Sequence, residues 1–473
     1  LLSGDGKRWG KAYSVSPNRG GSSIIRLPEA EAAYLRIDLL KPANDRSYGI
    51  REIKIPDVRS TLTSNDFIMY AARNSPAGSY PDYFSGRASY WTVTGVSSDT
   101  KEALISEDGM VEAEKARFSL EPMLKTGNTL INHSNVQPEQ VMGFPGYSGD
   151  YVFLPSVEWR QNGIRFVTGV SSGGKPNDDS ELYIGYRFEN TLAEPLELEF
   201  YLLLRPYQVN PYYQFLNTVG GIGRIVSVRE ISKGLISVDG KPVRLTEEYE
   251  SFGAAKFDEG NPVEMIRMGE MPVSSGVTDP SGMAGGIVKY RIKLKAGESK
   301  ELFAIIPYHS VIRESSGQGA GENPPQVIRA KSSGEGVMPH TLPQTTAEAG
   351  EKFFASADYW NKRTGHIRFD LPLSADRLID TWRSNLAYIL INRDRAGIQP
   401  GSRSYDRSWI RDGSLTSSAL LKSGIVPEVK EFIEWYAAHQ YDNGKVPCVV
   451  DFRGSDPVPE NDSHGQLIYL IRE

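Results

Sequence analysis

The feature that most constrains the fold is a long series of short, strand-like segments between residues 90 and 307. Glycine, asparagine, aspartate and proline residues separate the segments, and few stretches between them have helical spacing. This pattern is typical of antiparallel sheets joined by tight turns. Because the stretch is long for one sandwich, we expect two extended sheets, a β super-sandwich over residues 59–310. The clearest segments are residues 90–93, 152–154, 182–184, 196–200, 287–292 and 302–306.

The first 58 residues also alternate between apolar and polar side chains. The alternation runs over residues 35–39 and returns over residues 53–55, which predicts half-buried strands. Turn-forming sequences at residues 4–6 and 20–22 separate the predicted strands. We therefore expect a β domain over residues 1–58.

Helical spacing replaces the strand pattern over residues 346–473. Residues 311–345, between the two patterns, are rich in glycine, serine and proline, which predicts a linker. Apolar residues then recur three and four positions apart, so we expect the first helices of an antiparallel array. One helix should follow a cap at Ser374, with Leu378, Trp382, Leu386, Ile389 and Leu390 on one face. A second helix should cover residues 412–422, and a third should start at Pro427. A fourth should follow a cap at Asp462 or Ser463, with Leu467, Ile468 and Ile471 on its buried face. A separate short helix is expected over residues 64–73, capped by Ser64 or Asn65.

Charge and composition exclude several classes of function. The 53 lysine and arginine residues and the 59 aspartate and glutamate residues give a formal net charge of −6, unlike a protein that neutralises a nucleic-acid backbone. No apolar run approaches the about 18 residues that cross a bilayer. The single cysteine, Cys448, excludes an intramolecular disulfide, and the six histidines lack zinc-binding spacing. We therefore expect no nucleic-acid partner, no transmembrane segment, no metal and no other cofactor.

The clearest chemical motif lies at residues 405–413, before a predicted helix. Its aromatic side chains are Tyr405 and Trp409, and its charged pair is Arg411 and Asp412. A sugar hydroxyl both donates and accepts, so a carboxylate beside an arginine can bind two hydroxyls of one ring. Trp409 offers a stacking face. The alternative is structural: Asp412 caps the helix and Arg411 neutralises it.

A second loop repeats this arrangement before the last predicted helix. Residues 451–455 and 459–466 are polar, and the second stretch carries Glu460, Asp462 and His464. Two successive helix starts of this kind favour a polar funnel at one end of a helical barrel. The alternative is that Asp462 only caps the helix and His464 is only a polar residue of its first turn.

These two loops resemble the substrate-binding loops of glucoamylase-type glycoside hydrolases. Residues 405–412 are similar to the first loop, and residues 459–462 before an apolar helix are similar to the second. The resemblance implies an (α/α)6 barrel and an oligo- or polysaccharide partner. It also implies that the terminal sugar is held by Tyr405, Trp409, Arg411 and Asp412. A super-sandwich followed by a toroid is the domain order of bacterial glucoamylase-like hydrolases and of the related disaccharide phosphorylases.

A second resemblance concerns the N-terminal region. Residues 3–9, 33–37 and 49–53 resemble the second half of a discoidin (coagulation factor 5/8 type C) jelly roll. Such modules often bind glycans or lipids, and a packing or spacer domain is the alternative. The expected fold class is therefore multidomain β plus α: a partial jelly roll, a large antiparallel super-sandwich and the helices of an incomplete (α/α)6 toroid.

The resemblance favours an inverting glycoside hydrolase of glucoamylase-like type that releases a terminal sugar. Twelve helices need on the order of 350 residues, far more than residues 347–473 supply. The family's two catalytic carboxylates follow the second loop, so we expect them beyond Glu473 in a longer protein. The alternatives are a phosphorylase on the same scaffold and a non-catalytic glycan-binding or structural protein.

Other polar segments rank below these loops. Residues 177–181 cluster oxygen atoms but lack EF-hand spacing, so a solvated turn is favoured over a calcium site. Glu158 and Glu460 are the carboxylates left for acid catalysis within the chain. Strand packing is the expected role of residues 155–159 and 205–211. The sequence does not determine the sugar, the linkage, the oligomeric state or the compartment. For the compartment, an extracytoplasmic location is slightly favoured.

Overall fold

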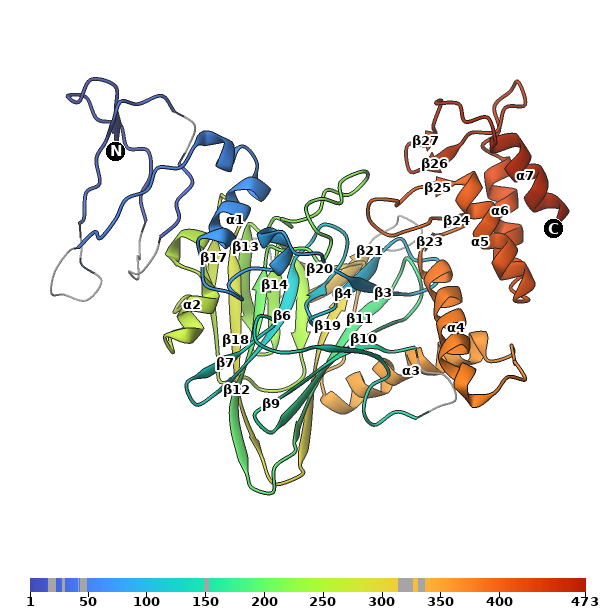
Figure 1. Ribbon diagram of the computed structural model, residues 1–473, viewed down its shortest axis with the longest axis horizontal. Coiled ribbons are helices and arrows are strands. Elements are labelled where there is room, and N and C mark those ends of the chain that lie inside the picture. Colours follow the sequence, from blue (N-terminus) through green and yellow to red (C-terminus); the bar gives the residue numbers. More distant parts are fainter. Residues whose placement is uncertain are drawn as a thin grey trace.

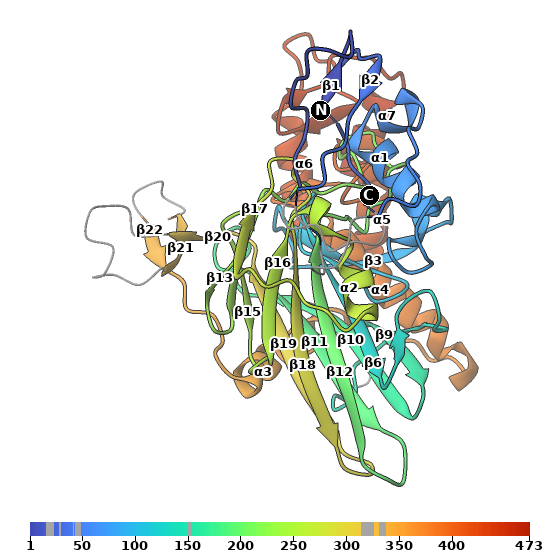
Figure 2. The ribbon, with the colours of Figure 1, turned by 90° about the vertical axis from the view of Figure 1, so that its left-hand side faces the viewer.

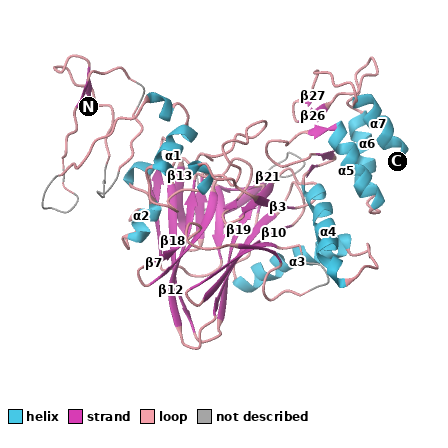
Figure 3. Ribbon diagram, viewed as in Figure 1, coloured by secondary structure: helices cyan, strands magenta, loops and turns pink. Residues whose placement is uncertain are grey.

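The computed structural model describes residues 1–15, 23–27, 30–40, 42, 49–148, 153–313, 326–330 and 337–473. These residues form several antiparallel sheets and seven α-helices, so the protein is multidomain and rich in β structure (Figure 1, Figure 3). A sandwich lies at the centre, and the N-terminal segment and the C-terminal helices lie over one end of it, on opposite sides (Figure 1, Figure 2). No described helix is both long enough and apolar enough to cross a bilayer.

Two large antiparallel sheets form the sandwich. The nine-stranded sheet has the order β17-β13-β14-β15-β19-β11-β10-β9-β8, and the eight-stranded sheet has the order β16-β18-β12-β6-β5-β4-β3, with β7 beside β6. The first sheet contains β8 (Glu139–Met142), β9 (Pro155–Gln161), β10 (Ile164–Gly173), β11 (Glu181–Asn190), β13 (Ser227–Ser232), β14 (Leu235–Val238), β15 (Lys241–Leu245), β17 (Gly276–Thr278) and β19 (Ser299–Pro307). The second contains β3 (Trp91–Gly95), β4 (Glu102–Ser106), β5 (Val111–Glu112), β6 (Ser119–Thr126), β7 (Thr129–Ile131), β12 (Leu196–Arg205), β16 (Ser251–Ala255) and β18 (Gly285–Leu294).

The two sheets share one hydrophobic core, to which both inner faces contribute. The Phe200 ring of β12 lies 5.0 Å from the Phe188 ring of β11 and 5.7 Å from the Phe166 ring of β10, measured between centroids. Contacts of this kind join facing sheets because alternate side chains of each strand point inward. The arrangement agrees with the two extended sheets that the sequence predicts.

One of the strands predicted for the sandwich, at residues 152–154, is wrong. The segments at residues 90–93, 182–184, 196–200, 287–292 and 302–306 overlap β3, β11, β12, β18 and β19. Phe153 and Leu154 are buried but belong to no strand, since β9 begins at Pro155, and residue 152 lies outside the described residues. Phe153 packs against Trp360 of a helix, with ring centroids 5.5 Å apart. Its apolar character reflects burial under that helix and not pairing within a sheet.

The N-terminal region has less β structure than its alternation predicts. β1 (Leu2–Ser3) pairs with β2 (Tyr34–Leu35), and the described part of residues 1–58 holds no other named strand. Residues 53–55 form no strand, and the Ile55 side chain is 78% exposed. Alternation predicts a strand only where a neighbour supplies hydrogen bonds and an apolar surface, and residues 53–55 are exposed throughout. The turn at residues 20–22 lies outside the described residues, and the jelly roll stays a prediction.

A helix occurs near each place where the sequence predicts one, the helix at Pro262–Arg267 is not predicted, and several of the predicted caps differ. Asp462 takes the N-cap position of the last helix, but its side chain makes no cap hydrogen bond. α1 is capped by Thr63, which accepts from the Asp66 N–H, and α4 follows Ala375, which makes no side-chain cap; Ser64, Asn65 and Ser374 are therefore not caps. A cap depends on the backbone angles of one residue, which composition does not fix. The α-helices are α1 (Ser64–Arg73), α2 (Pro262–Arg267), α3 (Thr346–Thr364), α4 (Asp376–Ile391), α5 (Ile410–Lys422), α6 (Pro427–Ala437) and α7 (Ser463–Arg472). The 3-10 helices are Val58–Thr61, Asp82–Ser85, Phe257–Glu259 and Leu373–Ala375.

The expected linker at residues 311–345 contains regular structure. β20 (Ser310–Arg313), β21 (Gln326–Ala330) and β22 (Val337–Pro339) form a small antiparallel sheet, which Figure 2 shows projecting to the left of the sandwich. The glycine- and proline-rich residues 315–325 on which the linker prediction depends lie outside the described residues. The linker therefore stays a prediction, and the described part of the segment contains these three short strands.

The C-terminal helices pack around α5, which contacts both α6 and α7. Gly413 allows the close approach of α6, because a Cβ atom there would lie 2.3 Å from the Phe432 ring. The predicted apolar face of α7 is only partly buried: Leu467 is 6% exposed, whereas Ile468 and Ile471 are 68% and 61% exposed. Leu470 faces inward in their place, and the (α/α)6 toroid stays a prediction.

Candidate functional site

A small sheet brings together the two loops that the sequence singles out. β25 (Ser408–Trp409) pairs with β26 (Val449–Asp451), which pairs with β27 (Gly454–Ser455). α5 starts immediately after β25, and α7 starts a few residues after β27. We use the term helix-start site for the set of predicted binding residues, which are Tyr405, Trp409, Arg411, Asp412, Glu460, Asp462 and His464. It lies in the C-terminal lobe of Figure 1.

Arg411 joins the two loops. Its Nε lies 2.5 Å from Oδ2 of Asp462, and its Nη2 lies 2.5 Å from Oε2 of Glu460. The side chain is 46% exposed, so water or a ligand can reach the guanidinium. The hydrogen bond from Arg411 holds the pKa of Asp462 below its usual range. The arginine of the first loop is therefore paired with carboxylates of the second loop and not with its neighbour Asp412.

Asp412 has a different environment from the one that the cap interpretation predicts. α5 begins at Ile410 with Trp409 as its N-cap residue, and Asp412 lies in the first turn. Nothing in the described part of the chain donates a hydrogen bond or forms an ion pair with its side chain, which is partly exposed. The cap interpretation is wrong because the helix starts earlier than the predicted residue 412. The carboxylate is left with the weak support of the helix dipole.

Trp409 lies between the polar groups of the first loop. The Arg407 guanidinium lies 5.8 Å from the centre of its ring, and Arg407 pairs with Asp451 and Asp456, both at 2.8 Å. The indole N–H of Trp409 is buried, and no acceptor for it exists among the described residues. A buried donor without a partner is costly, so this N–H adds nothing to the stability of the loop.

Tyr405 and His464 lie at the margin of the site. Tyr405 is 52% exposed, and His464 is exposed near the start of α7. No hydrogen bond or ion pair links either side chain to Arg411 within the described ranges. The geometry thus connects Arg411, Glu460 and Asp462 directly, leaves Asp412 free, and places Tyr405 and His464 at the surface.

A buried arginine beneath the first loop attaches it to the sandwich. The Arg403 side chain is 3% exposed, and it pairs with Glu102 of β4 at 2.8 Å and with Glu112 of β5 at 2.9 Å. Glu112 also accepts hydrogen bonds from the backbone N–H groups of Val209 and Asn210, at 2.8 and 3.0 Å. Residues 209–210 therefore support the loop through Glu112, a role that the predicted strand packing of residues 205–211 does not include.

Further contacts fix the same loop. Lys115 lies 2.8 Å from the Asp406 carboxylate, and the Asn217 amide donates to the Ser404 carbonyl at 2.8 Å. Burial raises the pKa of Glu102 to about 8 although Lys115 and Arg403 oppose the shift, and burial raises the pKa of Asp394 to about 6. The sequence gives no signal for this cluster, because Arg403 is 301 residues from Glu102 and 291 from Glu112.

The loop that carries Asn217 exposes a group of apolar side chains. Because Asn217 binds the Ser404 carbonyl, this loop lies beside Tyr405. Exposed apolar groups on one loop are suited to contact with a ligand or another surface. They are Tyr213 at 41%, Phe215 at 63%, Leu216 at 60% and Val219 at 61% exposure.

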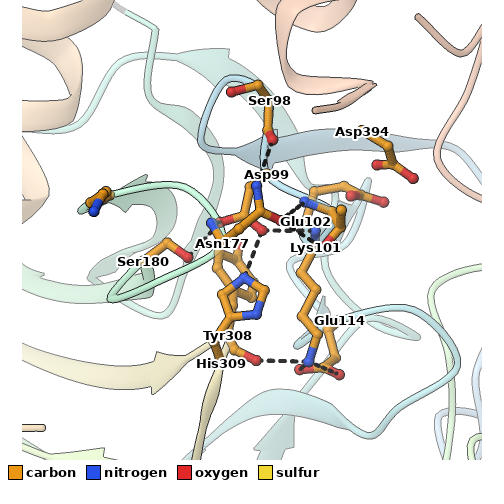
Figure 4. Close-up of polar contacts among 12 residues, drawn as sticks. Ser98, Asp99, Lys101, Glu102, Glu114, Asn177, Ser180, Tyr308, His309 and Asp394 are labelled. Atoms are coloured by element: carbon orange, nitrogen blue, oxygen red, sulfur yellow. Dashed lines mark hydrogen bonds and ion pairs between the residues drawn. The ribbon is translucent and has the colours of Figure 1, made fainter. Parts of the chain in front are cut away.

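A second polar cluster lies deeper in the sandwich, where Figure 4 shows Asp99 between three segments of chain. Asp99 is fully buried and receives hydrogen bonds from the Asn177 N–H at 2.9 Å and the Ser180 hydroxyl at 2.5 Å, and its other oxygen lies 2.7 Å from His309 Nε2. Nearby, Lys101 and Lys241 both contact Glu114, at 3.2 and 2.7 Å. These contacts are internal, so the cluster is a structural support.

Asp99→Asn is expected to weaken the fold and to flatten its acid dependence. Burial opposes ionisation, but His309, Ser180 and Asn177 hold the pKa of Asp99 below its usual value near 3.8. A depressed carboxyl pKa stabilises the fold above the unfolded value, and this stabilisation is lost as the pH falls through the folded value. Urea unfolding at pH 7 should show a loss of about 1.5–3 kcal/mol.

The same variant should lose less additional stability than the wild type between pH 5 and pH 3. Asp442→Asn, which changes an exposed carboxylate, is the matched control and should follow the wild-type profile. A D99N profile parallel to that of the wild type would contradict the assigned role of Asp99.

The remaining predicted polar segments have structural partners. Glu158 of β9 is 5% exposed and pairs with Arg160 and Arg165, so the structure gives it no catalytic position. In residues 177–181, Asp178 and Asp179 face Arg329. Glu181, with His340 at 2.9 Å and Lys352 at 3.2 Å, is buried and not solvated as predicted. Among the described residues, no three or more histidine, cysteine, aspartate or glutamate side chains lie together as a metal site requires.

Comparisons with known proteins add little to this geometry. No protein-family model and no curated protein matches the chain. Among solved structures, one described as a kojibiose phosphorylase from the human microbiome matches 81% of this chain and 49% of its own, at 8% identity and a TM-score of 0.36. A polysaccharide lyase matches 81% of this chain and 64% of its own, at 11% identity and a TM-score of 0.23. This chain thus spans about half of the first and less than two thirds of the second.

Proposed function

We propose that this chain binds the terminal sugar of an oligo- or polysaccharide at the helix-start site, as part of an inverting glycoside hydrolase of glucoamylase-like type. The proposal depends on one observation above the others: Asp412, whose carboxylate has no partner within the described residues, directly follows Arg411, whose guanidinium is half-exposed, in the sequence of α5. A pyranose needs an acceptor and a donor on adjacent hydroxyls, and these two groups supply both.

The surroundings of the pair support a sugar ligand. Glu460 and Asp462 hold the Arg411 guanidinium in place, so a ligand need not pay the entropy of ordering it. Tyr405, which is 52% exposed, offers a ring face to a sugar. Inversion also requires two carboxyl groups about 6.5–9.5 Å apart, and we assign none of the described carboxyl groups to that pair.

Asp412→Asn is expected to lower the affinity for the bound oligosaccharide about tenfold or more, since a hydrogen bond to a charged group contributes about 1.5–3 kcal/mol. The melting temperature should stay close to that of the wild type, because the Asp412 carboxylate has no partner within the described ranges. Titration calorimetry with maltose, kojibiose, cellobiose and laminaribiose, and with longer members of each series, measures the affinity.

Asp442→Asn, at an exposed carboxylate of the same lobe, is the control and should bind as the wild type does. Product release assayed with and without inorganic phosphate separates hydrolysis from phosphorolysis in any protein form that turns over. A lower melting temperature of D412N combined with unchanged affinity would show that Asp412 only supports the helix.

A further inference from the structure

A cleft of about 480 Å³ lies at one edge of the sandwich, away from the helix-start residues. β3 is the edge strand of the eight-stranded sheet, and β8 is the edge strand of the nine-stranded sheet. Residues of both edges line the cleft, and α4 forms its remaining wall. The volume falls within the range of about 300–1,000 Å³ typical of ligand sites. The cleft shares no residue with the helix-start site.

Aromatic rings line the cleft on two of its walls. Tyr90 and Trp91 come from the sheet edge, and Tyr388 comes from α4. Tyr90 is 66% exposed, which is costly for a large ring unless something covers it. Flat aromatic faces bind the apolar faces of pyranose rings, because the C–H groups of a sugar lie on one side of its ring.

Polar groups in the same cleft complete the requirements of a polyhydroxylated ligand. Gln140 of β8 and Asn385 of α4 each offer an amide oxygen as acceptor, and Arg377 offers donors. The Asn385 amide nitrogen donates to the Thr381 carbonyl at 2.8 Å, which orients its oxygen. The amide, guanidinium and ring groups come from different elements, so they surround the cleft and do not lie on one face.

The charges in the cleft select against an anion. Two carboxyl groups, those of Glu107 and Asp380, line the cleft together with one guanidinium, that of Arg377. Burial raises the pKa of both carboxyl groups, with Asp108 adding to the shift at Glu107 and Asp376 adding to it at Asp380. A phosphate or uronate would meet this excess of carboxylates, whereas a neutral sugar would accept from or donate to them.

We propose that this cleft is a second carbohydrate site, which takes a segment of a neutral oligosaccharide. It goes beyond the proposed function, because it uses the sandwich edge and α4 and none of the residues assigned to the terminal sugar. α4 is the second helix of the C-terminal region, after α3, and it precedes the loop with Arg403, so a glycan bound here contacts both the sandwich and a helix of the C-terminal region.

Tyr90→Ala is the most direct test, because the ring is exposed and its loss should not harm the fold. Maltohexaose, cellohexaose, laminarihexaose and mannohexaose are the neutral probes, and hexagalacturonate is the anionic probe. We expect at least one neutral probe to bind the wild type, with an affinity that falls about tenfold in Y90A. Asn385→Leu should reduce the affinity similarly, because it replaces the amide acceptor with an apolar side chain of similar size.

Hydrogen exchange locates the bound probe independently of the variants. Amides of residues 377–388 and 140–142 should be protected by the neutral hexasaccharide that binds. Arg411→Met should leave this protection intact, so failure of the helix-start site and failure of the cleft are distinguishable.

Several results would overturn the cleft proposal. The proposal is wrong if none of the neutral hexasaccharides binds, or if those that bind have the same affinity for Y90A as for the wild type. Hexagalacturonate protecting residues 377–388 in place of a neutral probe would also overturn it.

Discussion

Replacing Arg403 with methionine is expected to destabilise the protein by about 3–5 kcal/mol, the cost of removing one partner from a buried ion pair. The Arg403 side chain is 3% exposed, and its partners Glu102 and Glu112 are 2% and 0% exposed. Without the guanidinium, Glu112 retains the N–H groups of residues 209–210, whereas the one charged partner left to Glu102 among the described residues is Lys115 at 3.7 Å. Urea unfolding monitored by tryptophan fluorescence measures the loss.

The pH dependence of the same variant separates a charge effect from simple loss of packing. Burial raises the pKa of Glu102 to about 8 even with Arg403 in place, so the loss should be largest above pH 8 and should shrink as the pH falls through that value, because a protonated Glu102 no longer needs a counter-charge. Arg59→Met is the control: Arg59 pairs with Asp57 at 3.0 Å, but its side chain is 82% exposed, so its unfolding midpoint should not move measurably. An R403M protein as stable as R59M would show that the loop does not depend on its attachment to the sandwich.

The C-terminal helices illustrate what local sequence determines. Proline at the first position of α6 predicts a helix with one buried face, formed by Val429, Phe432, Ile433, Tyr436 and Ala437. Val429, Phe432 and Tyr436 are buried, Ile433 is half-buried, and Ala437 is exposed. Helical spacing is a local property, so it can be recognised without knowing what the helix packs against. The same reasoning misplaces Ile468 and Ile471, because burial depends on the neighbour as well as on the spacing.

The candidate site shows the same division. Tyr405, Trp409, Arg411 and Asp412 lie within eight residues, so the motif can be read from the sequence, as can the polar loop around Asp462. That Arg411 pairs across to Asp462 and not with Asp412 could not be read, since the two loops meet only through the pairing of β25 with β26.

The buried supports and the cleft have no local signature at all. No sequence pattern marks the segments that contain Glu102, Glu112 and Arg403. These residues are close because the C-terminal region packs on the sandwich. The cleft likewise combines two sheet edges with a helix that follows them in the chain. Sequence patterns predict elements, whereas these features belong to the contacts between elements.

Replacing Trp360 with alanine is expected to cost about 3–5 kcal/mol, because truncation of a fully buried tryptophan leaves a cavity. Trp360 is 1% exposed on α3, the helix that packs against β10, β11 and β19. Its ring lies 5.5 Å from the Phe153 ring, which in turn lies 5.5 Å from the Tyr388 ring of α4. The chain of rings thus connects both helices to the sandwich.

Thermal and urea unfolding of W360A measure this loss, and Phe452→Ala is the control. Phe452 is 96% exposed, so deleting an aromatic ring there should leave the midpoint almost unchanged. Because Phe153 separates Trp360 from Tyr388, the W360A cavity should also raise the hydrogen exchange of α4 under native conditions. Two results would contradict this prediction: an unfolding midpoint of W360A equal to that of F452A, or α4 amides that exchange as slowly as those of the wild type. Either would mean that other contacts hold α3 and α4 to the sandwich.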